Sequence, residues 1–194
     1  MTTIGWVRHG VTDWNVERRA QGQTDIPLND TGREQARRLA ERLKDEPPWD
    51  ALYASDLSRA RETAETIGAA LGLPVSVDAR LREISFGSME GTTLEERLRD
   101  HGPGWESLPF GREKPEEAAG RGASFVADVL ARHAGMRVLI VSHGALIGNT
   151  LRRLAPREEM EAHLGNTSLT VMRLDDDAWT CLLYNCTKHL PDAK

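Results

Sequence analysis

Residues 137–144 read Arg-Val-Leu-Ile-Val-Ser-His-Gly, and residues 3–10 read Thr-Ile-Gly-Trp-Val-Arg-His-Gly. The run of aliphatic residues in the later stretch is typical of a strand that is buried on both faces, as in a parallel sheet. Each stretch ends in a histidine followed by a glycine. If the two strands are parallel neighbours, His9 and His143 project into one crevice beyond the carboxyl ends of the strands, where α/β folds bind their ligands.

Strand and helix signals alternate along the rest of the chain. Further strands are predicted over 51–54 and 74–77, with closing strands over 168–174 and 179–184 around an acidic turn at 175–177. Helices are predicted from a capping box at Thr31 and Glu34 to the prolines at 47–48, from Ser55 or Asp56 to about 71, over about 123–133 and over 144–154.

Glycines and prolines interrupt the segment from 81 to about 122, which predicts an irregular excursion of the kind that is often functional. The pattern as a whole predicts an α/β fold, a three-layer α/β/α sandwich with a mostly parallel central sheet. We expect one domain over residues 1–194, with a small inserted cap at about 84–122.

Composition excludes several classes of protein. Hydrophobic residues make up 39% of the chain and charged residues 28%, which is globular rather than disordered. The net charge of −5 argues against a nucleic-acid-binding surface. We find neither a signal peptide nor an apolar run long enough to span a membrane. Cys181 and Cys186 are too few for a disulfide framework, so we expect reduced thiols and a cytoplasmic protein, monomeric or homodimeric.

The residues after the predicted strands have the chemistry of a phosphate site. Arg8 precedes His9, and Arg59 lies in the first turn of a helix whose N-terminus favours anions. A neutral imidazole is a competent nucleophile toward phosphorus, and the surrounding cations stabilise the transferring group. Glu83 could protonate the leaving alkoxide and then deprotonate the attacking water, with Glu90 as the alternative acid.

The stretch Arg8-His9-Gly10-Val11-Thr12-Asp13-Trp14-Asn15 resembles the Arg-His-Gly motif of the histidine phosphatase superfamily, the phosphoglycerate mutase-like proteins. Later elements at 21–22, 55–64, 83–91 and 142–144 follow in the family's order, so the resemblance covers nearly the whole chain. It implies that His9 becomes phosphorylated, that Glu83 donates and accepts the proton, and that neither a metal nor a cofactor is needed. It also implies a set of residues around the phosphoryl group: Arg8, Asn15, Gln21, Gly22, Arg59, His143 and Gly144.

Departures from the family pattern bear on the activity. The sequence from Glu83 through Gly87 to Glu90-Gly91 resembles the phosphatase branch, and the cap looks shorter than that of true mutases. The expected function is therefore metal-independent hydrolysis of small phosphomonoesters, of one kind or of several. The alternatives are a cofactor-dependent phosphoglycerate mutase and a non-catalytic module that binds phosphorylated ligands.

Several residues have no assigned role in this scheme. Trp105 and Phe110 could either line a substrate pocket or hold the cap in place. The remaining histidines show no metal-ligand spacing and are predicted to be surface or capping residues: His101, His133, His163 and His189.

Overall fold

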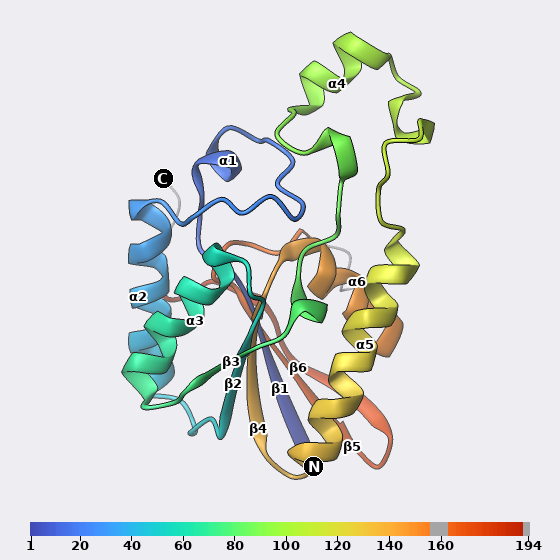
Figure 1. The fold of residues 1–194 in the computed structure, drawn as a ribbon. Coiled ribbons are helices and arrows are strands. Elements are labelled where there is room, and N and C mark those ends of the chain that lie inside the picture. Colours follow the sequence, from blue (N-terminus) through green and yellow to red (C-terminus); the bar gives the residue numbers. More distant parts are fainter. Residues whose placement is uncertain (156–162, 192–194) are drawn as a thin grey trace.

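A mixed sheet forms the centre of the computed structural model, which describes residues 1–155 and 163–191 (Figure 1). Within those residues the strands are β1 (Thr2–Arg8), β2 (Ala51–Ala54), β3 (Val75–Val77), β4 (Arg137–Ser142), β5 (Leu169–Asp175) and β6 (Ala178–Cys186). Their order is β3-β2-β4-β1-β5-β6. The first four of these are parallel, whereas β5 runs antiparallel to β1 and β6 antiparallel to β5.

Helices cover both faces of this sheet (Figure 1). The helices α2 (Asp30–Lys44) and α3 (Ser58–Leu71) pack on one face, and α5 (Pro115–Arg132) and α6 (Gly144–Leu154) on the other. Alternate side chains of β1 point to opposite faces of the sheet. Ile4 and Trp6 pack under α5 and α6, while Val7 packs under α2 and α3. The predicted three-layer α/β fold with a mostly parallel sheet is confirmed.

The irregular excursion lies between β3 and α5. It contains α4 (Leu94–His101) and three 3-10 turns, at Ala79–Leu81, Gly87–Met89 and Trp105–Ser107. In Figure 1 this green segment projects beyond the sheet at the end where the short helix α1 (Asp13–Val16) also lies. We call residues 84–114 the cap.

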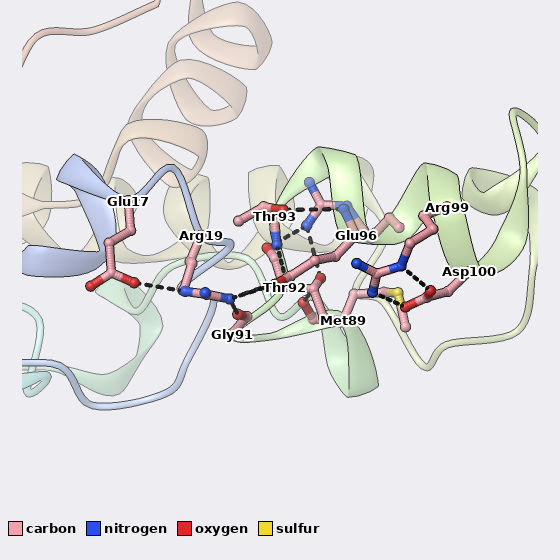
Figure 2. A network of polar contacts seen from close by, with 10 residues as sticks. Glu17, Arg19, Met89, Gly91, Thr92, Thr93, Glu96, Arg99 and Asp100 are labelled. Carbon is pink, nitrogen blue, oxygen red and sulfur yellow. Dashed lines mark hydrogen bonds and ion pairs between the residues drawn. The ribbon is translucent and has the colours of Figure 1, made fainter.

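Arg19, in the loop after α1, fastens that loop to the cap (Figure 2). Its guanidinium forms ion pairs with Glu17 at 2.7 Å and with Glu96 of α4 at 3.0 Å. It also donates a hydrogen bond to the carbonyl of Gly91 at 2.7 Å. A backbone bridge between Arg19 and Thr93 adds to this connection, so the cap and the segment after β1 are held together.

Some predicted helix starts are wrong. Asn29, rather than the pair Thr31 and Glu34, caps α2, because its side chain accepts the amide hydrogen of Gly32. The helix α3 starts at Ser58, after the N-cap residue Leu57. The helix α5 starts at Pro115 instead of near residue 123. Gly122 lies inside it because the helix packs closely against α6, where a Cβ on Gly122 would lie 2.0 Å from Thr150.

The closing hairpin matches its prediction to within one or two residues at each end. Asp176 and Asp177 form its turn with φ values of 44° and 66°, a conformation that aspartate tolerates better than most residues. None of the helices in the described residues is both long enough and apolar enough to cross a membrane.

Candidate active site

A cavity of about 650 Å³ opens at the carboxyl ends of the parallel strands. It is lined by every residue that the sequence predicts for the site except His143: Arg8, His9, Asn15, Gln21, Gly22, Arg59, Glu83 and Gly144. His143 is fully buried behind the cavity wall, where its ring centroid lies 5.1 Å from that of His9. The two imidazoles are therefore brought together as the parallel pairing of their strands predicts.

Strand register sets the two histidines side by side. Arg8 at the end of β1 pairs with Ser142 at the end of β4, so the next residue of each strand carries an imidazole. Burial, and then the nearby cation of Arg59, hold the pKa of both His9 and His143 well below the usual 6.5. Both rings are therefore neutral at physiological pH, which leaves His9 a lone pair for attack.

The hydrogen bond of His9 selects which nitrogen carries that lone pair. Its Nδ1 lies 2.7 Å from the carbonyl oxygen of Gly10, which can only accept a hydrogen bond, so Nδ1 carries the proton and Nε2 is the nucleophile. The amide of Gly10 in turn donates to Thr63 Oγ1 at 3.1 Å. Glycine is required at position 10 because a Cβ there would lie 2.5 Å from the carbonyl oxygen of Gly32.

The two arginines are buried with part of their donor capacity unused. Arg59 is fully buried and donates to the carbonyls of Gly22 at 2.7 Å and Thr24 at 2.8 Å. Burial lowers the pKa of Arg59 to about 10, so its guanidinium stays charged at neutral pH. Among the described residues, Nε of Arg8, Nε of Arg59 and both ring nitrogens of His143 have no hydrogen-bond partner. Buried polar groups of this kind normally require a partner, and an oxyanion would supply one.

The N-terminus of α3, which the sequence predicts to bind the phosphate, does not offer a free backbone amide at Ser58. Ser58, at the start of α3, donates its backbone amide to the carboxylate of Asp25 at 2.7 Å. A carboxylate of the protein therefore already satisfies this amide. The contribution of α3 to the cavity comes from the side chain of Arg59 instead.

Glu83 is held at the cavity by backbone amides. Its carboxylate accepts hydrogen bonds from Ala145 at 3.1 Å and Leu146 at 2.9 Å, both in the first turn of α6. The backbone carbonyl of Glu83 accepts hydrogen bonds from the guanidinium of Arg121 at 3.0 Å and from the side-chain amide of Gln23 at 3.1 Å. This support aims a half-buried carboxyl group into the same space as His9.

Glu90, the alternative acid, lies outside the cavity lining. Its carboxylate accepts the backbone amides of Gln23 at 3.0 Å, Thr24 at 2.8 Å and Phe86 at 3.1 Å. These contacts join the 21–24 loop to the cap, so Glu90 has a structural position. Of the two glutamates, the geometry favours Glu83 as the group that could exchange a proton with a ligand.

Hydrogen bonds hold the predicted loop residues Asn15, Gln21 and Gly22 in the cavity lining. Thr12 donates through its hydroxyl to Gln21 Oε1 at 2.9 Å, and its backbone amide donates to Asn15 Oδ1 at 3.1 Å. The carbonyl of Gly22 accepts from Arg59. Gly144, at the start of α6, lies against Arg8, where a Cβ would be 3.4 Å from Nε.

Other residues of the cavity carry no clear signal in the sequence. They come from the α1 loop, the cap, α6 and the segment before β5: Trp14, Arg18, Phe86, Arg97, Asn149, Arg152, His163, Leu164 and Asn166. The last three could have been anticipated only from the orientation of β5. Because β5 is antiparallel to β1, the segment that enters it lies at the same edge as the end of β1.

The undecided aromatics do not line the cavity. Trp105 is 7% exposed and packs inside the cap, with the guanidinium groups of Arg97 and Arg112 4.6 and 5.4 Å from its ring. Phe110 packs against His101, with ring centroids 4.9 Å apart.

The remaining histidines are predicted to be surface or capping residues, and the structure shows where they lie. His133 is the C-cap residue of α5 and bonds to the Tyr53 hydroxyl at 2.9 Å, as a capping residue should. His163 is exposed, as predicted, and lines the cavity, where its ring lies 3.0 Å from Arg8 Nη1. His189 differs from the prediction, because it is half-buried and bonds to the buried Thr167.

The neutral state of His143 predicts a pH dependence of stability. The unfolded chain gains a proton at this residue below pH 6.5, whereas the folded protein gains it only at lower pH. The free energy of unfolding should therefore fall as the pH drops from 7 to 5. His143→Gln should reduce that slope by up to about 1.4 kcal/mol per pH unit in urea unfolding experiments. The exposed His101→Gln is the matched control, and equal slopes in His143→Gln and wild type would contradict the prediction.

Comparison with known proteins finds relatives over nearly the whole chain. Residues 4–187 match the family model of the histidine phosphatase superfamily (branch 1). The chain is 36% identical over 197 residues to phosphoglycerate mutase-like protein 4 of Arabidopsis thaliana, covering 96% of this chain and 86% of the relative. It is 37% identical over 192 residues to the uncharacterized phosphatase PhoE of Bacillus subtilis (strain 168), covering 98% and 97%.

Solved structures show the same fold over almost the full length. YhfR of Bacillus stearothermophilus superposes with a TM-score of 0.88 at 32% identity, covering 97% of this chain and 99% of that one. A mutant phosphoserine phosphatase from Entamoeba histolytica, in complex with phosphoserine, gives a TM-score of 0.84 at 29% identity and covers 98% and 100%.

Proposed function

This chain belongs to branch 1 of the histidine phosphatase superfamily, and from that membership we propose that it hydrolyses small phosphorylated metabolites through a phosphohistidine at His9. One observation carries the proposal. The neutral imidazole of His9 shares a cavity with two buried arginines that retain unused donors, and with the carboxyl group of Glu83. We assign these groups the roles of nucleophile, anion clamp and proton carrier.

In the first step, Nε2 of His9 attacks the phosphorus of the bound ester. The bond between phosphorus and the ester oxygen breaks, and the leaving oxygen takes a proton from Glu83. Arg8 and Arg59 bind the phosphoryl oxygens through the donors that lack protein partners, whereas His143 does not line the cavity and packs against His9. The positive charge of the arginines stabilises the oxygens of the transferring group.

In the second step, water takes the place of the alcohol. The Glu83 carboxylate removes a proton from water, whose oxygen forms a bond to phosphorus as the bond to His9 Nε2 breaks. The electron pair of that bond returns to the imidazole, and Glu83 regains its proton for the next cycle. Glu83 is half-buried whereas His9 is only 2% exposed, so solvent has access to the base rather than to the nucleophile.

The charge around the cavity supports an anionic substrate of small size. Four further arginines line the cavity wall, namely Arg18, Arg19, Arg97 and Arg152, although the chain as a whole carries a net charge of −5. Trp14 and Phe86 supply apolar wall beside them. A phosphomonoester with a short carbon skeleton fits this lining better than a neutral or strongly cationic ligand.

Phosphate release in excess EDTA tests the proposal. We expect p-nitrophenyl phosphate and at least one natural phosphomonoester, from a panel that includes phosphoserine and 3-phosphoglycerate, to be hydrolysed without added metal. Hydrolysis that depends on an added divalent cation would contradict the proposal. So would isomerisation of 3-phosphoglycerate without release of phosphate, or phosphate binding without turnover of any ester.

A further inference from the structure

The segment that enters β5 lies directly behind His9. The backbone amide of Thr167 donates to the carbonyls of Arg8 at 2.9 Å and His9 at 3.3 Å. The side-chain amide of Asn166 donates to the same His9 carbonyl at 3.0 Å. Two neighbouring residues therefore bind the backbone oxygen of the proposed nucleophile from a segment more than 150 residues away in the sequence.

These contacts fix the plane of the peptide group that joins His9 to Gly10. Its carbonyl is bound by Asn166 and Thr167, and its amide donates to Thr63. The next carbonyl, that of Gly10, accepts the proton on His9 Nδ1 and so selects Nε2 as the nucleophile. Rotation of the His9–Gly10 peptide would displace that acceptor and loosen both the tautomer and the aim of the ring.

Thr167 maintains these contacts in an unfavourable backbone conformation. It is fully buried and has a φ of 53°, in the left-handed region that β-branched residues avoid. A residue remains in such a conformation only when its surroundings hold it there, and conformations of this kind concentrate at functional sites. Its hydroxyl donates to the carbonyl of Asn166 at 2.8 Å, which leaves the hydroxyl oxygen as an acceptor.

His189, in the C-terminal segment after β6, reaches that oxygen. Its Nε2 lies 3.1 Å from Thr167 Oγ1, and its Nδ1 lies 3.4 Å from Nη1 of Arg42 on α2. Because a guanidinium can only donate, Nδ1 accepts and Nε2 carries the proton that binds Thr167. Burial and the charge of Arg42 lower the pKa of His189 to about 4, which keeps this tautomer neutral.

We propose that His189 is a positioning residue for His9, acting through Thr167 and the His9–Gly10 peptide. The inference rests on the proposed role of His9 as nucleophile. His189 does not line the cavity, so it does not contact the substrate. It holds Thr167 in place, and Thr167 with Asn166 holds the backbone that orients the His9 ring.

Steady-state kinetics of two variants test this role. His189→Leu removes the donor, and we expect kcat to fall about 10- to 100-fold because the imidazole is misaligned. KM and the inhibition constant of inorganic phosphate should change less than about threefold, since Arg8 and Arg59 keep their contacts. His189→Gln can still donate to Thr167 and should restore kcat to within about threefold of wild type. Lys188→Ala, at the exposed neighbouring position, is the matched control.

A second variant guards against an effect on folding alone. Thr167→Gly removes the hydroxyl but suits a positive φ, so it should lower kcat as His189→Leu does while the fold is retained. The proposal is overturned if His189→Leu keeps kcat within about twofold of wild type. It is also overturned if the Gln variant is as impaired as the Leu variant, or if phosphate affinity falls in step with kcat.

A spectroscopic readout separates this proposal from the proposed function. Nitrogen-15 chemical shifts of His9 report its tautomer without any substrate. Wild type should show the proton on Nδ1, and His189→Leu should show a mixture of both tautomers. If wild type releases no phosphate from any ester, the proposed function fails, and the tautomer comparison still decides the positioning role. An unchanged His9 spectrum in His189→Leu would overturn it.

Discussion

Replacing His9 with alanine should lower phosphate release by at least about 10³-fold, because it removes the imidazole that forms the covalent intermediate. His143, the neighbouring imidazole, lies behind the cavity wall and cannot substitute. The affinity for inorganic phosphate should change little, since Arg8 and Arg59 remain. The first measurement is kcat for p-nitrophenyl phosphate. The second is the amount of phosphate that a radioactive phosphoester leaves on the protein, and whether that label survives acid or base.

The label distinguishes this expectation from a general loss of activity. Wild type should retain phosphate that is stable in base and labile in acid, as a phosphoramidate bond is, and His9→Ala should retain none. His101→Ala, at an exposed position of the cap, is the control and should behave as wild type. Activity of His9→Ala within about tenfold of wild type would rule out His9 as the nucleophile.

The second large effect concerns Glu83 and depends on the leaving group. Glu83→Gln cannot supply a proton, so hydrolysis of alkyl phosphates should fall by about 10²- to 10⁴-fold. Aryl phosphates should lose much less in the first step, because p-nitrophenolate leaves without being protonated. The ratio of kcat/KM for an alkyl ester to that for p-nitrophenyl phosphate should therefore drop sharply.

Glu90→Gln provides the matched comparison. Its carboxylate binds backbone amides of the 21–24 loop and of Phe86, so the variant should lower stability and reduce both activities by a similar factor. If Glu83→Gln also reduced the two activities equally, Glu83 would not be the acid. A selective loss in Glu90→Gln would move that role to Glu90.

Much of the fold follows from local sequence. The strands over 51–54 and 137–142 were predicted to the residue, because short apolar runs with clear turn signals on either side leave little freedom in their bounds. The neighbouring positions of His9 and His143 follow from one further assumption, that their strands pair in parallel. Positions at strand ends are therefore the part of a candidate site that a single sequence predicts best.

What could not be predicted depends on distant packing. Gly122 looks like a helix breaker in the sequence but lies inside α5, because the close approach of Thr150 requires a residue without a side chain. His163 and His189 show no periodic pattern, and their contacts exist only because β5 runs antiparallel to β1 and the chain after β6 returns toward α2. No spacing rule connects residue 189 to residue 9.

The attachment of the cap has a consequence for engineering. Most of the salt bridges and hydrogen bonds of Arg19 go to cap residues, to Glu96 in the first turn of α4 and to Gly91 three residues before that helix. A chimera that takes its cap from a relative with another substrate would keep this attachment only if the donor presents a carboxylate at the place of Glu96. Cap exchange thus requires matching this ionic contact and the hydrogen bonds of Glu90 to the 21–24 loop, while the sheet and its histidines can be left as they are.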